Sequence, residues 1–280
     1  MTDLRVAEKL AWLLKSTKSD DVAFLECEGK VYFARHSAGK REPTSAIVAL
    51  VQGLHEHPPE SVLKLVRQRI YATAAPTNMC RGLVKVTARR LTAPITPIDH
   101  RNIDMTPHLV EVTPPNPPEP PALVQARSPL REPAQFMKMA FDLATQVPRD
   151  KPLYECSRPI AAILVSATNE ILAHALNTNV CNRTQHAEVN LIQSYYLATG
   201  RGVPANSTLY TTLKPCRMCA AMIWHMADDI KSLQVFYGAH DPGPQARETI
   251  LDARSPDRRH ACLSSDLAHL LDLQLEQLLL

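Results

Sequence analysis

The sequence predicts an α/β protein, in which a three-layer α/β/α domain over residues 131–280 follows a smaller α/β domain over residues 1–100. In both parts, the hydrophobic residues change repeatedly between the period of a helix and the period of a strand. Hydrophobic residues make up 45% of the chain, which is enough for a core in each part. Nine of the 23 prolines lie between Pro107 and Pro133, so residues 101–130 are predicted to be a semi-rigid linker.

In the N-terminal domain, the pattern of hydrophobic residues predicts a mixture of helices and strands. A helical pattern comes first, and two short apolar runs follow it as a pair of strands. The expected elements are a helix near residues 4–14, strands near 22–27 and 31–35, helices near 45–54 and 60–72, and a strand near 83–88.

The C-terminal domain opens with apolar residues at helical spacing, followed by two apolar runs around a polar tetrapeptide, which indicates a β-hairpin. Gly200 is expected to end the next helix, and Pro215 suits the first turn of a later one. The order is α-β-β-α-β-α-β-α, which is typical of a three-layer domain. The expected strands are 160–166, 171–176, 207–212 and 233–237, and the expected helices start near 136, 186, 215 and 266.

The composition argues against several classes of protein. There is no G-x-G-x-x-G motif and no Walker P-loop among the eight glycines. The N-terminus is charged and lacks the apolar region of a signal peptide, and no stretch reaches the roughly 20 apolar residues that span a bilayer. The seven cysteines are an odd number, which predicts a reducing compartment, hence the cytoplasm, with thiols that are free or bound to metal.

One group of residues has the spacing of a metal site. Cys216 and Cys219 are three residues apart at an expected helix start, so both sulfurs lie on one face of its first turn. The N-terminus of a helix stabilises thiolates, and a neutral His186 would complete three protein ligands. Three ligands leave the fourth tetrahedral position open, as in catalytic zinc sites. We therefore expect one Zn²⁺ per chain.

Glu188 stands two residues after His186 and can approach a water on the metal without being a ligand. Zinc lowers the pKa of such a water toward about 7. Glu188 would take the water proton, pass it to a ring nitrogen and later protonate the leaving ammonia. The arrangement H-x-E…P-C-x-x-C is typical of zinc-dependent deaminases. Two cysteines and a core histidine that meet by chance are the alternative.

These residues resemble the cytidine deaminase-like superfamily, most closely its tRNA adenosine deaminase branch, over about residues 131–280. Pro159–Val165 is similar to the first strand of that family, Leu209–Ile223 to its second zinc segment, and Phe236–Asp241 to the strand and loop that follow. The resemblance implies a β-sheet with helices on both faces, zinc held at two helix starts, and hydrolytic deamination of a base.

The resemblance also implies which residues contact the substrate. Asn177, at the end of the second strand, stands where the family uses Asn to contact the base or sugar, and Asn179 is close enough to take that role. The backbone N–H of Ala187 would face the base. Lys214 is a departure, because the adenosine deaminases of the family usually have Glu before Pro-Cys.

A short segment of the N-terminal domain echoes the helix that follows His186. Ser45–Gln52 aligns with His186–Gln193, with Ala, Val, Leu and Gln in common, and both segments follow two expected strands. The N-terminal domain is therefore a candidate degenerate copy of the same fold, with chance similarity as the alternative. In such a copy, Ser45 replaces the His ligand and Ile47 replaces the catalytic Glu.

Positive charge is concentrated in the N-terminal domain. Residues 1–100 carry 15 Lys and Arg against 10 Asp and Glu, whereas residues 131–280 carry 14 against 15. Arg81, Lys85 and Arg89 share one face of the expected strand, and Lys64, Arg67 and Arg69 precede them on the expected helix. This surface could contact the phosphates of a nucleic acid, or it could be an ordinary solvated face.

The predicted function is zinc-dependent hydrolytic deamination of a nucleobase, with adenine in RNA such as tRNA as the leading substrate and inosine as the product. One alternative is a deaminase of a free base, nucleoside or nucleotide of the cytosine or guanine type. Another is a non-catalytic, zinc-stabilised binding subunit, against which the intact Glu188 argues. We expect either a homodimer or a chain whose two domains pair as the two subunits of relatives do.

Overall fold

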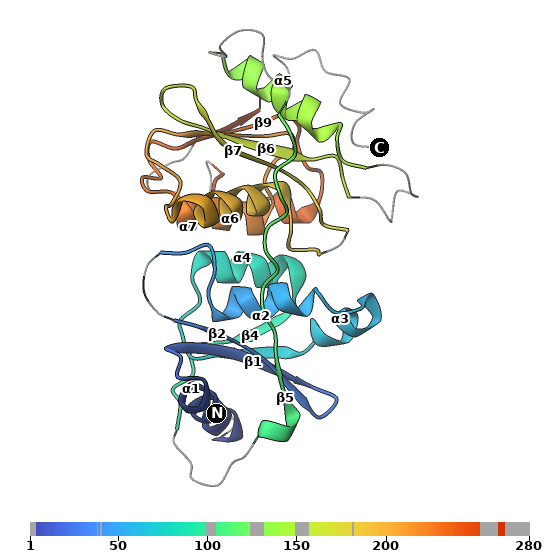
Figure 1. Ribbon diagram of the computed structural model, residues 1–280, viewed down its shortest axis with the longest axis vertical. Coiled ribbons are helices and arrows are strands. Elements are labelled where there is room, and N and C mark those ends of the chain that lie inside the picture. Colours follow the sequence, from blue (N-terminus) through green and yellow to red (C-terminus); the bar gives the residue numbers. More distant parts are fainter. Residues whose placement is uncertain are drawn as a thin grey trace. The chain divides into compact units, whose positions relative to one another are not determined.

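The computed structural model describes residues 4–37, 39, 41–98, 105–123, 132–148, 157–180, 182–252 and 263–266. The chain divides into two compact units, Met1–Asn116 and Pro117–Leu280. Each unit contains its own five-stranded sheet, and both are α/β structures, as predicted (Figure 1). None of the helices in the described part of the chain combines the length and apolar character needed to cross a bilayer.

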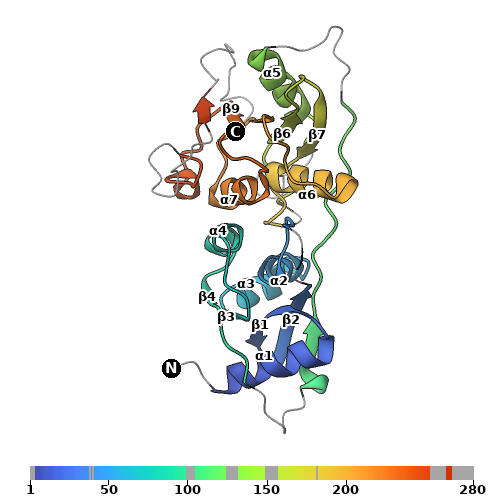
Figure 2. The same cartoon turned by 90° about the vertical axis from the view of Figure 1, so that its left-hand side faces the viewer.

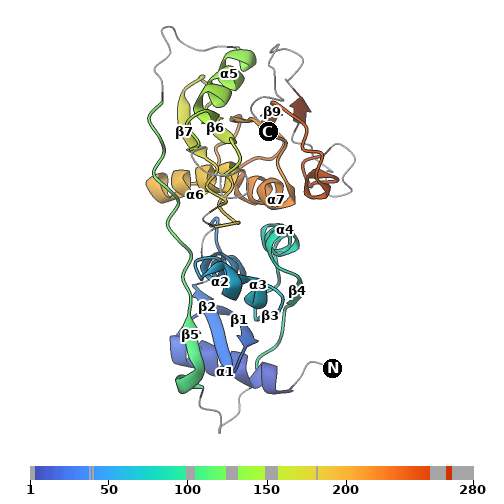
Figure 3. The same ribbon diagram turned by 90° about the vertical axis from the view of Figure 1, so that its right-hand side faces the viewer.

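The N-terminal unit places helices on both faces of a mixed sheet. The sheet has the strand order β4-β3-β1-β2-β5. In Figures 2 and 3, α1 covers one face, and α2, α3 and α4 cover the other. The elements are α1 (Leu4–Thr17), β1 (Asp21–Cys27), β2 (Lys30–His36), α2 (Ala46–Leu54), α3 (Pro59–Leu65), β3 (Arg69–Ala72), α4 (Asn78–Thr87), β4 (Arg90–Thr92) and β5 (Leu109–Glu111).

Two predictions for this unit are wrong. The expected helix over 60–72 ends at Leu65, and its last residues form β3. The expected strand over 83–88 is part of α4, which Thr77 caps by accepting a hydrogen bond from the Cys80 N–H. The buried residues of α4 recur at helical spacing, so one apolar side faces the sheet: Met79, Cys80, Leu83, Val84 and Thr87.

The predicted linker over 101–130 also differs from the structure. Leu109–Glu111 forms β5, which pairs in parallel with β2 and belongs to the N-terminal unit. These three residues carry backbone N–H groups and can join a sheet edge, whereas the proline-rich residues after Thr113 cannot. The Val112 N–H continues the pairing by donating to the Phe33 carbonyl at 2.9 Å.

The C-terminal unit has the predicted three layers. The sheet order is β10-β9-β8-β6-β7; α5 lies on one face, and α6 and α7 lie side by side on the other (Figures 1 and 2). The elements are α5 (Pro133–Ala144), β6 (Ala161–Val165), β7 (Ile171–Leu176), α6 (Ala187–Thr199), β8 (Thr208–Thr211), α7 (Arg217–Met226), β9 (Gln234–Tyr237) and β10 (Leu263–Asp266). Asp266 ends a strand, and the rest of the expected closing helix lies outside the described residues.

The boundaries of these elements follow from single residues. Asn169, in the hairpin between β6 and β7, has a positive φ of 65°. Gly200 ends α6 in the left-handed conformation, which glycine adopts without steric cost. Pro215 lies one residue before the N-cap of α7, because Cys216 is the cap.

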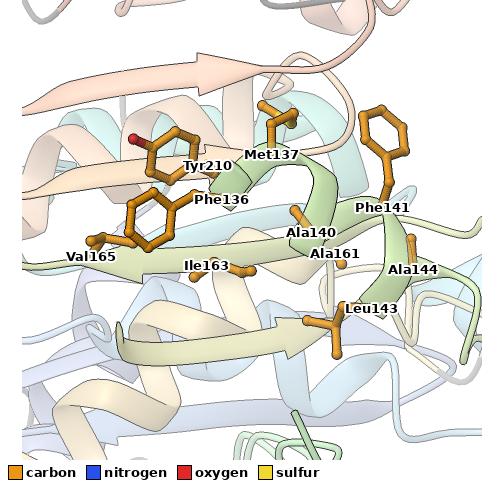
Figure 4. Close-up of a cluster of buried hydrophobic side chains, with 10 residues drawn as sticks. All are labelled: Phe136, Met137, Ala140, Phe141, Leu143, Ala144, Ala161, Ile163, Val165 and Tyr210. Atoms are coloured by element: carbon orange, nitrogen blue, oxygen red, sulfur yellow. The ribbon is translucent and has the colours of Figure 1, made fainter. Parts of the chain in front are cut away.

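Aromatic side chains form the core between α5 and the sheet. Phe136 stacks on Tyr210 with ring centroids 5.3 Å apart, and Tyr210 stacks on Phe236 at 5.5 Å. Figure 4 shows Phe136, Ile163 and Tyr210 in one buried cluster with residues of α5. Burying each large apolar side chain contributes about 1.5–3 kcal/mol, so this layer holds α5 against the sheet.

Candidate metal centre

Three residues at the starts of two neighbouring helices form the candidate metal centre. His186 is the N-cap of α6, Cys216 is the N-cap of α7, and Cys219 lies in the first turn of α7. Both helices lie against the same face of the sheet, so their N-termini bring the three side chains together (Figure 2). Residues far apart in the sequence thus meet because the strand order places β6, β7 and β8 side by side.

The donor atoms have the spacing that a tetrahedral zinc ion needs. The Cys216 Sγ and Cys219 Sγ are 3.5 Å apart, and they lie 3.6 and 3.5 Å from the His186 Nδ1. Tetrahedral bonds of about 2.3 Å to sulfur and about 2.0 Å to nitrogen place the donors roughly 3.5–3.8 Å apart. The three residues present therefore fit a zinc ion, with one position left for another ligand.

The two thiols are buried and free of disulfides. The hydrogen bond between them holds the pKa of Cys216 well below its ordinary value. Burial raises the pKa of Cys219 above its ordinary value. One sulfur therefore ionises more readily than the other, and a metal that takes both as thiolates releases a proton on binding.

Glu188 lies on the first turn of α6, two residues from the His186 cap. Its side chain is only 3% exposed, and burial raises the pKa of its carboxyl group. The hydroxyl of Thr211, at the end of β8, donates to the Glu188 Oε1 at 3.1 Å. A carboxyl group whose pKa is raised by burial holds a proton more readily than an exposed one, which suits a group that accepts a proton and later returns it.

Thr211 is a site residue that the sequence analysis missed. Its side chain is fully buried and also lies within 3.2 Å of the Leu213 carbonyl. Strand alternation could have shown that Thr211 points away from the face of Thr212. Its partner could not have been inferred, because Glu188 belongs to another element.

Asn177 follows β7 directly and is 2% exposed. Its Nδ2 donates to the Arg158 carbonyl at 3.0 Å and to the Asn179 Oδ1 at 2.9 Å. Its Oδ1 is buried and has no hydrogen-bond partner within the described residues. Asn179 thus orients Asn177, and the Asn177 carbonyl oxygen is the atom left to accept a bond from a ligand.

Ala187 begins α6 and is fully buried. Its backbone N–H belongs to the first turn of the helix, where no intrahelical carbonyl can accept from it. Lys214, the departure noted in the sequence, forms an ion pair of 2.7 Å with Asp252, and both side chains are largely buried. Lys214 therefore ties the segment before Cys216 to the segment after β9.

The predicted basic residues lie in the N-terminal unit, and all of them except Lys64 of α3 lie on other elements than expected. Arg81 and Lys85 are exposed one turn apart on α4, and Arg89 is exposed just before β4. Arg81 and Lys85 share a side because of the four-residue helical repeat and not because of strand alternation, whereas Arg89 lies beyond the end of the helix. Lys64 pairs with Glu28 at 2.7 Å, and Arg69 donates to the Thr92 Oγ1.

Comparison with known proteins finds relatives of this chain. A family model described as Bd3614-like deaminase matches residues 151–262. A tRNA-specific adenosine deaminase of Agrobacterium fabrum is 36% identical over 92 residues, which cover 32% of this chain and 58% of the relative. The tRNA-specific adenosine deaminase of Bacillus subtilis is 32% identical over 102 residues, which cover 36% of this chain and 60% of the relative.

Solved structures of deaminases are also similar. A structure from work on A-to-I editing by tRNA:A34 deaminases is 30% identical, with a TM-score of 0.38, and the match covers 47% of this chain and 96% of that one. The guanine deaminase of Bacillus subtilis is 26% identical, with a TM-score of 0.31, over 39% of this chain and 66% of that one. The chain spans less than two thirds of the curated relatives named above. Residues 151–262 are therefore similar to the Bd3614-like deaminase family, and the chain is similar in sequence to tRNA-specific adenosine deaminases over about a third of its length.

Proposed function

We propose that the C-terminal unit catalyses the hydrolytic, zinc-dependent deamination of a nucleobase. The observation that carries the proposal is the meeting of His186, Cys216 and Cys219 at zinc-like spacing, with the buried Glu188 beside them. These three residues would hold one zinc ion, which supplies, when bound, a water activated for attack near neutral pH.

The residues of the chain would then move the protons. Glu188 accepts a proton from the attacking water and transfers it to the ring nitrogen next to the attacked carbon. Glu188 takes the second proton of that water as the carbon–nitrogen bond breaks and delivers it to the leaving amine, which departs as ammonia. The carboxyl group ends each cycle as it began, and the base has exchanged its amino group for oxygen.

The substrate contacts in this proposal come from the residues around the centre. Asn177 holds the base or sugar through its Oδ1, which has no hydrogen-bond partner within the described residues. Asn179 fixes the orientation of the Asn177 side-chain amide by accepting from its Nδ2. The backbone N–H of Ala187 faces the base. These roles are supported by the burial and hydrogen bonding of Asn177 and by the position of Ala187 at a helix N-terminus.

We propose adenine within RNA, such as tRNA, as the substrate. The curated relatives that match this chain are tRNA-specific adenosine deaminases, and the N-terminal unit carries the excess of positive charge. Arg81, Lys85 and Arg89 would contact phosphates. A free base, nucleoside or nucleotide is the second candidate, favoured by the net charge of −1 over residues 131–280, which attracts no polyanion.

One experiment separates these candidates. Ammonia release is measured for the purified full chain with free purines, free pyrimidines, their nucleosides and nucleotides, and total tRNA. Release of ammonia from tRNA with formation of inosine supports the proposal. Release only from a small molecule would mean that this small molecule, and not RNA, is the substrate. A parallel purification from cells that do not express the chain is the control, because ammonia release in that sample comes from a contaminating enzyme.

The proposal also places the protein in the cytoplasm and assigns it no membrane partner. The free thiols of Cys27, Cys80, Cys216 and Cys219 support a reducing compartment. The proposed assembly is either a homodimer or a single chain whose two units pair. Light scattering on the purified protein distinguishes them by mass.

A further inference from the structure

The sheets of the two units share four strands with the same order and directions. In the N-terminal unit, β4-β3-β1-β2 corresponds to β9-β8-β6-β7 of the C-terminal unit. In both, the two central hairpin strands are antiparallel, the third strand is antiparallel to the first, and the fourth is parallel to the third. The fifth strand differs, since β5 joins the β2 edge and β10 joins the β9 edge.

The register of the strands is the same as well. Tyr71 faces Phe24 and Thr92, and Tyr210 faces Ile163 and Phe236. On its other side Phe24 pairs with Phe33, and Ile163 pairs with His174. Phe33 lies 12 residues before Ser45 (45 − 33), as His174 does before His186 (186 − 174), so one alignment satisfies two independent strand pairings. A shift of one residue would reverse the side of every side chain, so agreement in register is stronger evidence of common origin than agreement in order.

The segment after this tyrosine repeats in sequence. Tyr71-Ala-Thr-Ala-Ala-Pro-Thr-Asn-Met-Cys80 aligns without gaps with Tyr210-Thr-Thr-Leu-Lys-Pro-Cys-Arg-Met-Cys219, sharing Tyr, Thr, Pro, Met and Cys. The shared threonines make the same bond. Thr73 Oγ1 accepts from the Val22 N–H at 3.1 Å, and Thr212 Oγ1 accepts from the Ala161 N–H at 3.2 Å.

Three polar residues of the N-terminal unit stand at the positions of the metal ligands. Ser45 is the N-cap of α2, as His186 is of α6. Thr77 is the N-cap of α4, as Cys216 is of α7, and Cys80 lies three residues after its cap, as Cys219 does.

These side chains also meet in space. The Cys80 Sγ lies 3.2 Å from the Ser45 Oγ and 3.3 Å from the Thr77 Oγ1. The corresponding sulfur of Cys219 lies 3.5 Å from both the His186 Nδ1 and the Cys216 Sγ. The hydroxyls also cap the helices, since Ser45 accepts from the Val48 N–H and Thr77 from the Cys80 N–H. The N-terminal cluster therefore keeps the arrangement of the metal centre with neutral hydroxyls in place of two ligands.

The residues beside the N-terminal cluster have lost the means to move a proton. Ile47 stands at the position of Glu188, and Ala72 stands at the position of Thr211, which donates to that carboxylate. Both replacements are apolar and buried. The N-terminal cluster thus lacks both the acid and its hydrogen-bond donor, as expected of a site that no longer catalyses the reaction. The chain would then have a single active centre.

We infer that the N-terminal unit is a duplicated deaminase fold whose metal site has been replaced by the Ser45–Thr77–Cys80 cluster, with the ligand geometry retained in the backbone. The inference goes beyond the proposed function, because it concerns the unit that holds no active centre. It predicts that two substitutions, Ser45→His and Thr77→Cys, restore a His-Cys-Cys zinc site.

The test is made in full-length protein that carries Cys216→Ser and Cys219→Ser, so that zinc in the C-terminal unit does not contribute. Bound zinc is measured after dialysis, and the Co²⁺ form is examined for thiolate charge-transfer absorption. We expect no bound zinc in this parent and about one zinc per chain after Ser45→His/Thr77→Cys. Ser45→His alone, which supplies His and one thiol, is the matched control and should bind far more weakly.

A folded double variant that binds no zinc would overturn the inference. If the double variant does not fold, Thr77→Cys alone exchanges one hydroxyl for a thiol and places two sulfurs as in the C-terminal centre. In the same parent, this variant should gain a Cd²⁺–dithiolate absorption that the parent lacks, and its absence would equally overturn the inference. Failure of the deaminase proposal appears in a different assay, as lack of ammonia release by the wild-type chain.

Discussion

At the scale of single residues, the residues around Glu188 determine the position and the pKa of its carboxyl group. Glu188 lies in the first turn of α6, its carboxyl group is buried, and the hydroxyl of Thr211 donates a hydrogen bond to it. The spacing of His186, Cys216 and Cys219 identified the candidate ligands from sequence because metal-site motifs are local. The role of Thr211 depends on the contact between the end of β8 and the first turn of α6, which no local sequence pattern contains.

The first prediction is that Glu188→Gln lowers the rate of the chemical step by at least about 10²-fold, the low end for general acid–base catalysis. Glutamine preserves size and can still accept from Thr211, so zinc content and thermal unfolding should hardly change. Single-turnover ammonia release measures the effect. Turnover equal to that of the wild type would rule out the assigned proton transfer.

The second prediction is that Thr211→Val lowers kcat by about tenfold or more, because a hydrogen bond to a charged group is worth about 1.5–3 kcal/mol. Valine has the shape of threonine without the donor, so KM and zinc content should stay near wild-type values. Thr211→Ser restores the hydroxyl and should recover most of kcat. An equal loss in both variants would point to packing, and the positioning role would be abandoned.

At the scale of elements, the hydrophobic period predicts the strands of both hairpins and the helices after them. Capping residues such as Gly200 predict where a helix ends. The segment over 78–87 was misread because Leu83–Ala88 also fits a strand when read alone. The evidence for a helix was the Thr77 cap and the apolar residues that begin at Met79, upstream of the predicted strand. Three-residue β5 had no signal of its own, since its pairing depends on β2.

The third prediction concerns α4 and Arg89, which lies just beyond the end of that helix. Arg81→Glu/Lys85→Glu/Arg89→Glu should weaken RNA binding across sequences and flatten its dependence on salt by roughly one unit of slope per lost phosphate contact. Fluorescence anisotropy with tRNA at several salt concentrations measures both effects. Activity on an isolated nucleoside, where present, should survive.

The matched control for that variant is Lys15→Glu/Lys18→Glu/Lys30→Glu. It makes the same change in net charge on exposed positions around α1 and β2. Equal weakening by both triple variants would show that overall charge, and not the surface around α4, determines binding. Unaltered affinity and salt slope in the first variant would exclude α4 as the RNA contact.

The fourth prediction concerns the packing of α5 on the sheet. Gly238 follows β9, and a Cβ atom there would overlap the Phe141 ring of α5. Gly238→Ala should therefore lower the free energy of unfolding by about 1–3 kcal/mol, as overpacking usually does. Urea denaturation measures it, with Gly39→Ala as the control, because nothing lies within 4 Å of a Cβ at Gly39. Equal stability of the two variants would contradict the close packing.

At the scale of the whole molecule, one chain contains two sheets that share the order of four strands, and one complete set of ligand residues among those described. The sequence echo between Ser45–Gln52 and His186–Gln193 was short, and the stronger repeat at Tyr71–Cys80 was hidden by the wrong expectation for α4. The duplication becomes visible through strand register, because register records long-range pairing that a single sequence does not display.

The central claim is that the C-terminal unit is a zinc-dependent deaminase with a single active centre per chain. The most direct test measures zinc content and ammonia release in the same preparation of the full chain, for the wild type and for Cys216→Ser/Cys219→Ser. The account predicts about one zinc per chain and ammonia release in the wild type, and neither in the double variant. A zinc-free chain that still deaminates, or a zinc-loaded chain that releases no ammonia from any base, nucleoside, nucleotide or tRNA, would contradict it.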